Sequence, residues 1–215
     1  MKSRKRIEFS VEKSRLASEA FWLWFTGVAG RLAADLDNDE ILTELDRRVR
    51  ELGPLTWEVG PGLQEPNFLA ISPAGQRKLL ELTDEIVRDA PSLPAWEFHS
   101  AKPAKRWTIR FSIEGSDGIS HLIDGVEWRY ILLRYPDGMF DIVILAPNLP
   151  ADARIEEQAG AIVVKGQLGE RLTLEHVRQI EIVRSLGPEN ERKSSSISDL
   201  PAHFSSLVSA NTSGT

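Results

Sequence analysis

The sequence predicts an α+β fold, with a mostly antiparallel sheet and two N-terminal helices, and three patterns support this prediction. Apolar residues recur at helical spacing between Asp35 and Leu52. Apolar and polar residues alternate strictly from Trp107 to Glu114, which is typical of a strand with one face in water. Two further strand-like runs, Val126 to Tyr135 and Met139 to Leu145, flank the turn at 136–138 and predict a β-hairpin.

Composition and charge narrow the classes of function. The chain has 215 residues, no cysteine and a net charge of −6. Without cysteine there are no disulfides, no thiol nucleophile and no thiolate metal site, and a reducing cytoplasm is the expected compartment. The acidic balance argues against a general nucleic-acid binder. No apolar run is long enough for a membrane helix, and Glu8 and Glu12 follow the basic start, so we expect neither membrane association nor a secretory signal.

Three regions are expected along the chain. Residues 1–15 are basic and predict a flexible start, which could also serve as an arm for an acidic partner. Residues 16–190 are expected to form a single α+β domain. Residues 191–215 are rich in Ser and predict a disordered tail, because such a composition buries little apolar surface. Docking of this tail through Leu200, Phe204 and Leu207 is left open.

Two helices are predicted before the first strand. The first runs from about Ser10 to Arg31, and we expect Gly27 and Gly30 to bend or end it. The second covers residues 35–52. It can be capped by Asp37 or Asn38, and Gly53-Pro54 ends it.

The remaining elements alternate in type. Strands are predicted at 55–59, 67–72, 96–100, 107–114, 119–123, 126–135, 139–145 and 177–184, with helices from about 75 to 89 and 151 to 168. The order strand–strand–helix–strand occurs at about 55–100 and returns at about 126–184. This order suggests two ββαβ halves that share one sheet core. A single α+β sheet without duplication fits equally well.

Several segments resemble a family of uncharacterised bacterial cytosolic proteins. Such proteins begin with an aromatic FWxWF helix and then carry an ISxxG turn, a PxLPxWxF segment and a late LGE. The matching segments here are Phe21-Trp22-Leu23-Trp24-Phe25, Ile71-Ser72-Pro73-Ala74-Gly75, Leu93-Pro94-Ala95-Trp96-Glu97-Phe98 and Leu168-Gly169-Glu170. The resemblance covers about residues 15–185. It implies a bacterial cytosolic α+β protein and brings no activity or catalytic residue with it.

Glu97, His99 and Lys102 form the one candidate ligand site. Glu97 and His99 are two residues apart on a predicted strand, so they share one face. A carboxylate favours the charged form of a neighbouring imidazole, and Lys102 adds an anion-attracting charge. The cluster could therefore bind a small anionic ligand. The alternative is an ordinary charged surface cluster that binds nothing.

Other motifs carry no chemistry. Ser10 and Lys13 match an SxxK pattern, but its partner motifs are absent. Gly60-Pro61-Gly62 lacks the residues of a phosphate loop. The basic strip at 102–107 ends in an aromatic residue and could touch nucleic acid, although a solvated loop is the simpler interpretation. We expect no metal site and no cofactor.

The aromatic helix is the candidate partner-binding face. Trp22 and Trp24 lie there, and large aromatic residues are enriched at interfaces, although they serve equally as core cover. The sequence therefore favours a protein-interaction or regulatory module without chemistry of its own, and an immunity protein that neutralises a toxin is one concrete form. A homodimer is left open. The alternative is a small enzyme or anionic-ligand-binding protein with a site near Glu97, His99 and Lys102.

Overall fold

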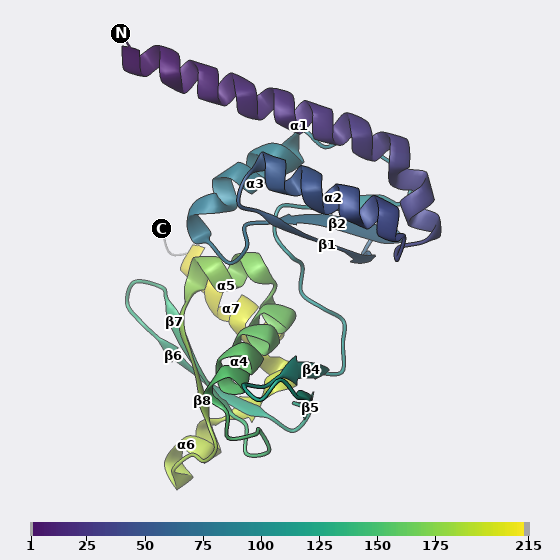
Figure 1. Ribbon diagram of the computed structural model, residues 1–215. Helices are drawn as coiled ribbons and strands as arrows, with labels where there is room; N and C mark the ends of the chain where they lie inside the picture. Colours follow the sequence, from purple (N-terminus) through teal and green to yellow (C-terminus); the bar gives the residue numbers. More distant parts are fainter. Residues whose placement is uncertain (1, 213–215) are drawn as a thin grey trace. The chain divides into compact units, whose positions relative to one another are not determined.

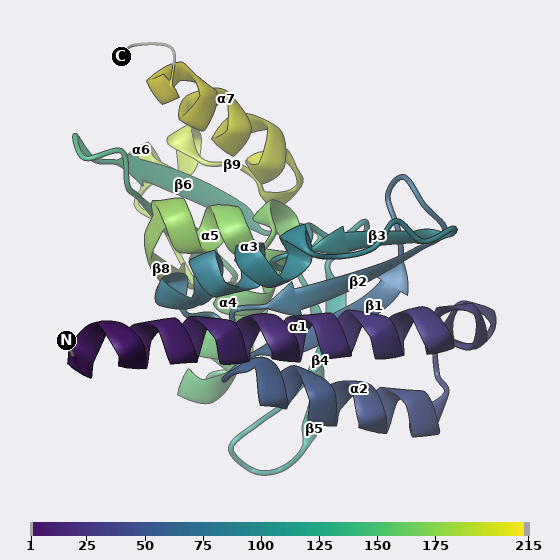
Figure 2. The same ribbon diagram turned by 90° about the horizontal axis from the view of Figure 1, so that it is seen from above.

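The computed structural model describes the backbone of residues 2–212 and the side chains of residues 15–209 (Figures 1 and 2). The chain divides into two compact units, Met1–Lys102 and Pro103–Thr215, and each is described by itself. The sequence-based division, with one domain over 16–190, places no boundary near residue 102. Among the described residues, none of the helices combines the length and apolarity that crossing a membrane requires.

The first unit is a three-stranded sheet with helices on one face. Its elements are α1 (Lys2–Ala34), α2 (Asp39–Leu52), β1 (Thr56–Pro61), β2 (Asn67–Ser72), η1 (Arg77–Leu79), α3 (Leu80–Arg88) and β3 (Trp96–His99). The strand order is β1-β2-β3, with β1 antiparallel and β3 parallel to β2. Figures 1 and 2 show α1 and α2 side by side. The two predicted N-terminal helices are therefore confirmed.

The aromatic segment of α1 supplies much of this unit's core. Phe21, Trp22 and Phe25 are almost fully buried, and they pack with apolar residues of the sheet such as Leu69 and Trp96. A buried indole needs a partner for its N–H. Trp22 Nε1 donates to the carbonyl of Ile86 at 2.8 Å, and Trp96 Nε1 donates to that of Ala29 at 3.1 Å. These bonds connect α1 to both α3 and the sheet.

The second unit contains two separate sheets. Its elements are β4 (Arg110–Glu114), β5 (Ser120–Asp124), β6 (Arg129–Arg134), β7 (Phe140–Leu145), α4 (Ala153–Leu168), α5 (Glu170–His176), β8 (Val177–Val183), α6 (Pro188–Lys193), β9 (Ser195–Ser196), η2 (Ile197–Asp199) and α7 (Leu200–Thr212). β4 and β5 form a hairpin, and the larger sheet has the order β8-β7-β6-β9. β8 is parallel to β7, and the other pairs are antiparallel.

The core of the second unit lies between the larger sheet and the helices α4 and α7. Inward residues of β7, namely Phe140, Ile142 and Ile144, are fully buried. They share one cluster with Ile155 and Val163 of α4. β7, which corresponds to the predicted strand 139–145, lies inside the sheet between β8 and β6.

The prediction of a disordered tail over 191–215 is wrong for the described part of that segment. Ile197, Leu200 and Phe204 are completely buried in the second unit's core. β9 pairs with β6, and Tyr130 Oη lies 2.8 Å from Nδ1 of His203. Although the segment is rich in Ser, its apolar residues recur at helical spacing. They form one apolar face of α7, and this face packs on the core.

Both units contain a ββαβ motif with the same connections. In the first, an antiparallel pair β1-β2 is followed by α3 and then by β3 parallel to β2. In the second, the pair β6-β7 is followed by α4 and α5 and then by β8 parallel to β7. The two predicted ββαβ halves are thus present. They do not share one sheet, because their strands belong to separate sheets.

Candidate functional site

The residues Glu97, His99 and Lys102 lie at the edge of the first unit's sheet. Strand register places Glu58, Ala70 and His99 in one row across β1, β2 and β3, so these side chains share a face. His99 Nε2 lies 3.1 Å from Oε1 of Glu97. Lys102 Nζ lies 3.7 Å from the carboxylate of Glu58.

The Glu97 carboxylate is engaged by its own chain. Its oxygens accept hydrogen bonds from the backbone N–H groups of Leu63, Gln64 and Glu65 at 2.8, 2.9 and 3.3 Å. Burial raises the pKa of Glu97, but these donors and His99 outweigh burial and lower the pKa to about 2. Backbone amides that converge in this way can hold an anion, and here Glu97 is that anion. This geometry gives Glu97 a structural task, which is to fix the β1–β2 loop.

The two tryptophans proposed as a partner-binding face have different environments. Trp22 is 4% exposed and belongs to the core, so it is not available to a partner on the surface of the first unit. Trp24 is partly buried, and the guanidinium of Arg48 lies over its ring at 4.8 Å. Core packing, which is the alternative open at the sequence level, accounts for both side chains.

Histidines do not gather into a metal site in the part of the chain that the structure describes. No group of three or more His, Asp or Glu side chains there could hold a metal ion. His121 lies 3.6 Å from Asp117, and His203 contacts Tyr130. The first contact stabilises the turn between β4 and β5, and the second connects α7 to β6.

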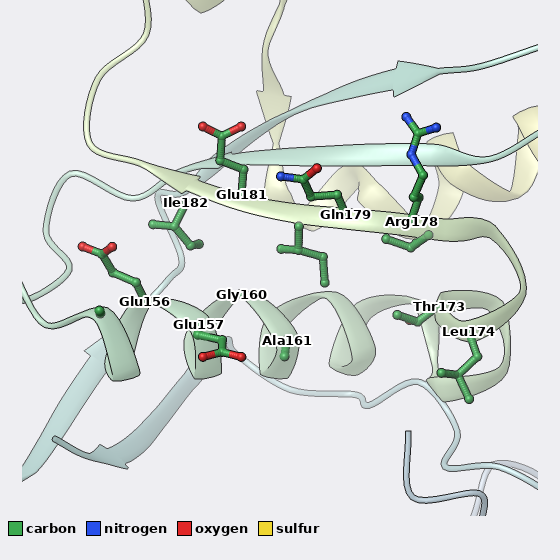
Figure 3. Close-up of a pocket in the computed structure, with 13 residues that line it drawn as sticks. Glu156, Glu157, Gly160, Ala161, Thr173, Leu174, Arg178, Gln179, Glu181 and Ile182 are labelled. Carbon is green, nitrogen blue, oxygen red and sulfur yellow. The ribbon is translucent and has the colours of Figure 1, made fainter. Parts of the chain in front are cut away.

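A groove in the second unit lies between α4 and the edge strand β8 (Figure 3). Its volume is about 510 Å³, and most of its wall is apolar. The lining residues come from three elements: Ala153, Glu156, Glu157, Gly160 and Ala161 of α4, Thr173 and Leu174 of α5, and Val177, Arg178, Gln179, Ile180, Glu181 and Ile182 of β8. None of them belongs to a motif that marks a site in the sequence.

Small residues on α4 create this groove. Ala153 and Ala161 lie on one stripe of the helix, with Glu157 between them, because the three positions are spaced by four residues. Gly160 allows the helix to approach the strand, because a Cβ there would lie 3.0 Å from Cγ2 of Ile180. The helix thus packs on β8 at Gly160 and leaves space beside the two alanines.

The outer edge of β8 is free among the described strands. β8 is the terminal strand of its sheet and pairs only with β7. An edge strand presents unpaired backbone N–H and C=O groups at alternate residues. The register between β7 and β8 shifts at Phe140/Asp141, where Arg178 is the extra residue. This bulge turns Arg178 to the side of the sheet away from α4 (Figure 3).

Charges along the groove are unevenly compensated. Arg178 donates to both carboxylate oxygens of Asp141 at 3.2 Å, and its guanidinium lies 3.7 Å from the centre of the Tyr135 ring. The bond to Asp141 raises the pKa of Arg178, and the bond from Arg178 lowers the pKa of Asp141. Arg184 forms an ion pair with Glu156 at 2.6 Å. Both arginines are thereby held in place by residues of the unit itself.

Two carboxylates remain at the groove without such compensation. Glu157 on α4 and Glu181 on β8 form no ion pair within the described residues. Glu157 and Glu181 are both exposed. The groove therefore combines a free strand edge, an apolar floor and an excess of negative charge.

The sequence holds only a partial signal for this groove. The strand at 177–184 and the helix at 151–168 are both predicted, and the small residues of the helix are visible. The local sequence pattern does not indicate which strand lies at the edge of its sheet, because the strand order depends on pairing between distant segments. Comparisons of the chain with protein-family models, with curated proteins and with solved structures find no match.

Proposed function

We propose that this protein acts by binding a segment of a partner protein, which lies in extended conformation along β8 and adds a strand to the sheet. The single observation that carries this proposal is the groove between α4 and the free edge of β8. Peptide-binding domains that work by strand addition use the same two walls, an edge strand and a helix. Main-chain hydrogen bonds supply affinity in this mode, and the groove selects side chains.

The length of β8 distinguishes it from the other edges of the two main sheets. β8 has seven residues, whereas β3 has four, β9 has two and β1, which ends at a proline, has six. Short strands and prolines protect a sheet edge against unwanted pairing. β8 contains no proline, and its edge borders a hollow in place of a covering element. This edge is the one best suited to receive another strand.

The mode of binding fits the function class that the sequence favours. A regulatory module or an immunity protein acts by binding its target, and strand addition requires no catalytic group. Because the Glu97 carboxylate already satisfies the loop amides, the first unit offers less support for the alternative of an anionic-ligand site.

Selection from a library of short random peptides displayed on phage tests the proposal. Ala161→Trp fills the groove, and Ala202→Trp places the same side chain at an exposed position of α7 outside it. Peptides enriched on the wild-type protein should bind the Ala202→Trp variant equally and lose binding to the Ala161→Trp variant. Enriched peptides that bind both variants alike would place the site elsewhere and contradict the proposal.

A further inference from the structure

We infer that the groove along β8 selects extended segments that carry basic side chains on both faces. This inference rests on the proposed function and adds the chemistry of the partner. It is carried by the positions of Glu157 and Glu181, one on each side of the strand that would be added.

Strand register defines the two sides. Ile180 and Ile182 pair with Ile142 and Ile144, whose side chains lie in the core beneath α4. Glu181 pairs with Val143 and therefore points to the opposite face, as Figure 3 shows. Successive side chains of a strand alternate between the faces, so an added strand would present every second side chain to each of them.

Each face of the added strand meets one uncompensated carboxylate. On the α4 side this group is Glu157, and on the opposite side it is Glu181. Directly opposite side chains of neighbouring strands interact, and opposite charges in such pairs are favourable. Arg178 is bound to Asp141 and Arg184 to Glu156, so neither of these two arginines neutralises Glu157 or Glu181.

The groove floor suits the long stems of Lys and Arg. Ala153 and Ala161 leave space beside the helix, and Leu174 closes the end of the groove near α5. The methylene stem of a basic residue can lie along such apolar surface while its charged end reaches a carboxylate. An acidic residue in the same place would meet Glu157 without a counter-charge, which would disfavour its binding.

Three synthetic peptides of equal length test the inference. They repeat Val-Val-Lys-Lys, Val-Val-Gln-Gln or Val-Val-Glu-Glu, so that both faces of the extended peptide carry the polar residue. Each peptide carries a fluorescein label, and binding is measured by fluorescence anisotropy. The Lys peptide should bind wild-type protein about three- to tenfold more tightly than the Gln peptide, because two exposed ion pairs together contribute an amount of this order. The Glu peptide should bind most weakly, and added salt should narrow the differences.

Charge variants locate the preference. In the double variant Glu157→Gln, Glu181→Gln, the Lys and Gln peptides should bind equally. Glu127→Gln removes a carboxylate that is exposed in the same unit and lies outside the groove, so this variant should keep the wild-type ratio. Glu157→Lys, Glu181→Lys should reverse the order and favour the Glu peptide. Unchanged circular dichroism and thermal midpoints establish that the variants are folded.

The outcomes separate this inference from the proposed function. If wild-type protein binds the Lys and Gln peptides equally and Ala161→Trp abolishes both, the charge preference is overturned and strand addition stands. If Glu127→Gln reduces the preference as much as the groove variants do, the effect is non-specific attraction and the inference fails. If none of the three peptides binds folded wild-type protein, the inference and the proposed function both fail.

Discussion

Glu97 shows how one partly buried carboxylate can determine the conformation of a loop. The segment between β1 and β2 is mostly exposed, and three of its backbone N–H groups donate to Glu97. A charged acceptor forms stronger hydrogen bonds than a neutral one, so the ionised form of Glu97 is the one that holds the loop. The pKa of Glu97, lowered to about 2, reflects this preference.

Glu97→Gln should therefore destabilise the first unit in a pH-dependent way. A lowered folded-state pKa contributes stability above the unfolded value of about 4.5, and this contribution is lost as pH falls toward 2. We expect a loss of about 2–3 kcal/mol at pH 7 and almost none at pH 2, measured by urea unfolding followed through tryptophan fluorescence. Glu65→Gln, in the same loop, is the control and should have little effect. A constant difference at all pH values would contradict the argument.

Gly166 is a position where the absence of a Cβ atom allows close packing against a neighbouring side chain. It lies in α4 beneath Trp107, and a Cβ there would be 2.4 Å from Cζ2 of the indole. Gly166→Ala should force this ring to move and should destabilise the second unit by about 1–3 kcal/mol, despite the better helix propensity of Ala. Thermal unfolding measures the change. Gly187→Ala, where the added atom meets open space, should change stability by less than about 0.5 kcal/mol.

Element boundaries show where local pattern is sufficient. The strand at 67–72 agrees with the sequence-based expectation. The second helix begins at Asp39, later than the expected start at residue 35, and Asn38, one of the two expected caps, accepts from the N–H of Ile41 at 3.1 Å. The strand expected from Trp107 starts only at Arg110. Ile109 has a φ of 55°, which interrupts the extended backbone although its side chain is buried.

The glycines of α1 do not end the helix as the sequence predicts. The helix continues to Ala34, and the positions of Gly27 and Gly30 face open space. Packing of the aromatic segment on the sheet outweighs their weak propensity. Gly30→Ala should consequently stabilise the first unit by about 0.5–1 kcal/mol, seen as a higher thermal midpoint. Destabilisation by this change would show that the position is covered or strained.

The C-terminal helix α7 is an integral element of the second unit. Phe204 is completely buried, and its ring lies 4.8 Å from that of Phe140. Phe204→Ala should cost about 3–5 kcal/mol of unfolding free energy, as measured by chemical denaturation. Ser205→Ala, at the next and exposed position, should cost less than about 0.5 kcal/mol. Equal small effects would restore the expectation that this segment is dispensable.

At the scale of the whole molecule, the order of helices and strands along the chain can be predicted from the sequence, and the pairing of the strands cannot. The repeated strand–strand–helix–strand order is readable because each element has its own period. The division into separate sheets depends on which strands meet, as when Ser195 of β9 pairs with Tyr130 of β6. The groove shares this limitation, since the edge position of β8 follows from pairing alone. The Glu97–His99 contact could be anticipated because it is local within one strand.

Two separate apolar cores predict that the second unit folds alone. Its buried cluster and both of its sheets consist of residues from Ile109 to Phe204, within the unit that begins at Pro103. A compact unit with its own core is expected to be an autonomous folding domain. A fragment of residues 103–215 should unfold cooperatively by calorimetry. A shorter fragment, 103–193, lacks β9, η2 and α7 and should show no cooperative transition, because Ile197, Leu200 and Phe204 no longer complete the core. Non-cooperative unfolding of the longer fragment would show that this core depends on residues before Pro103.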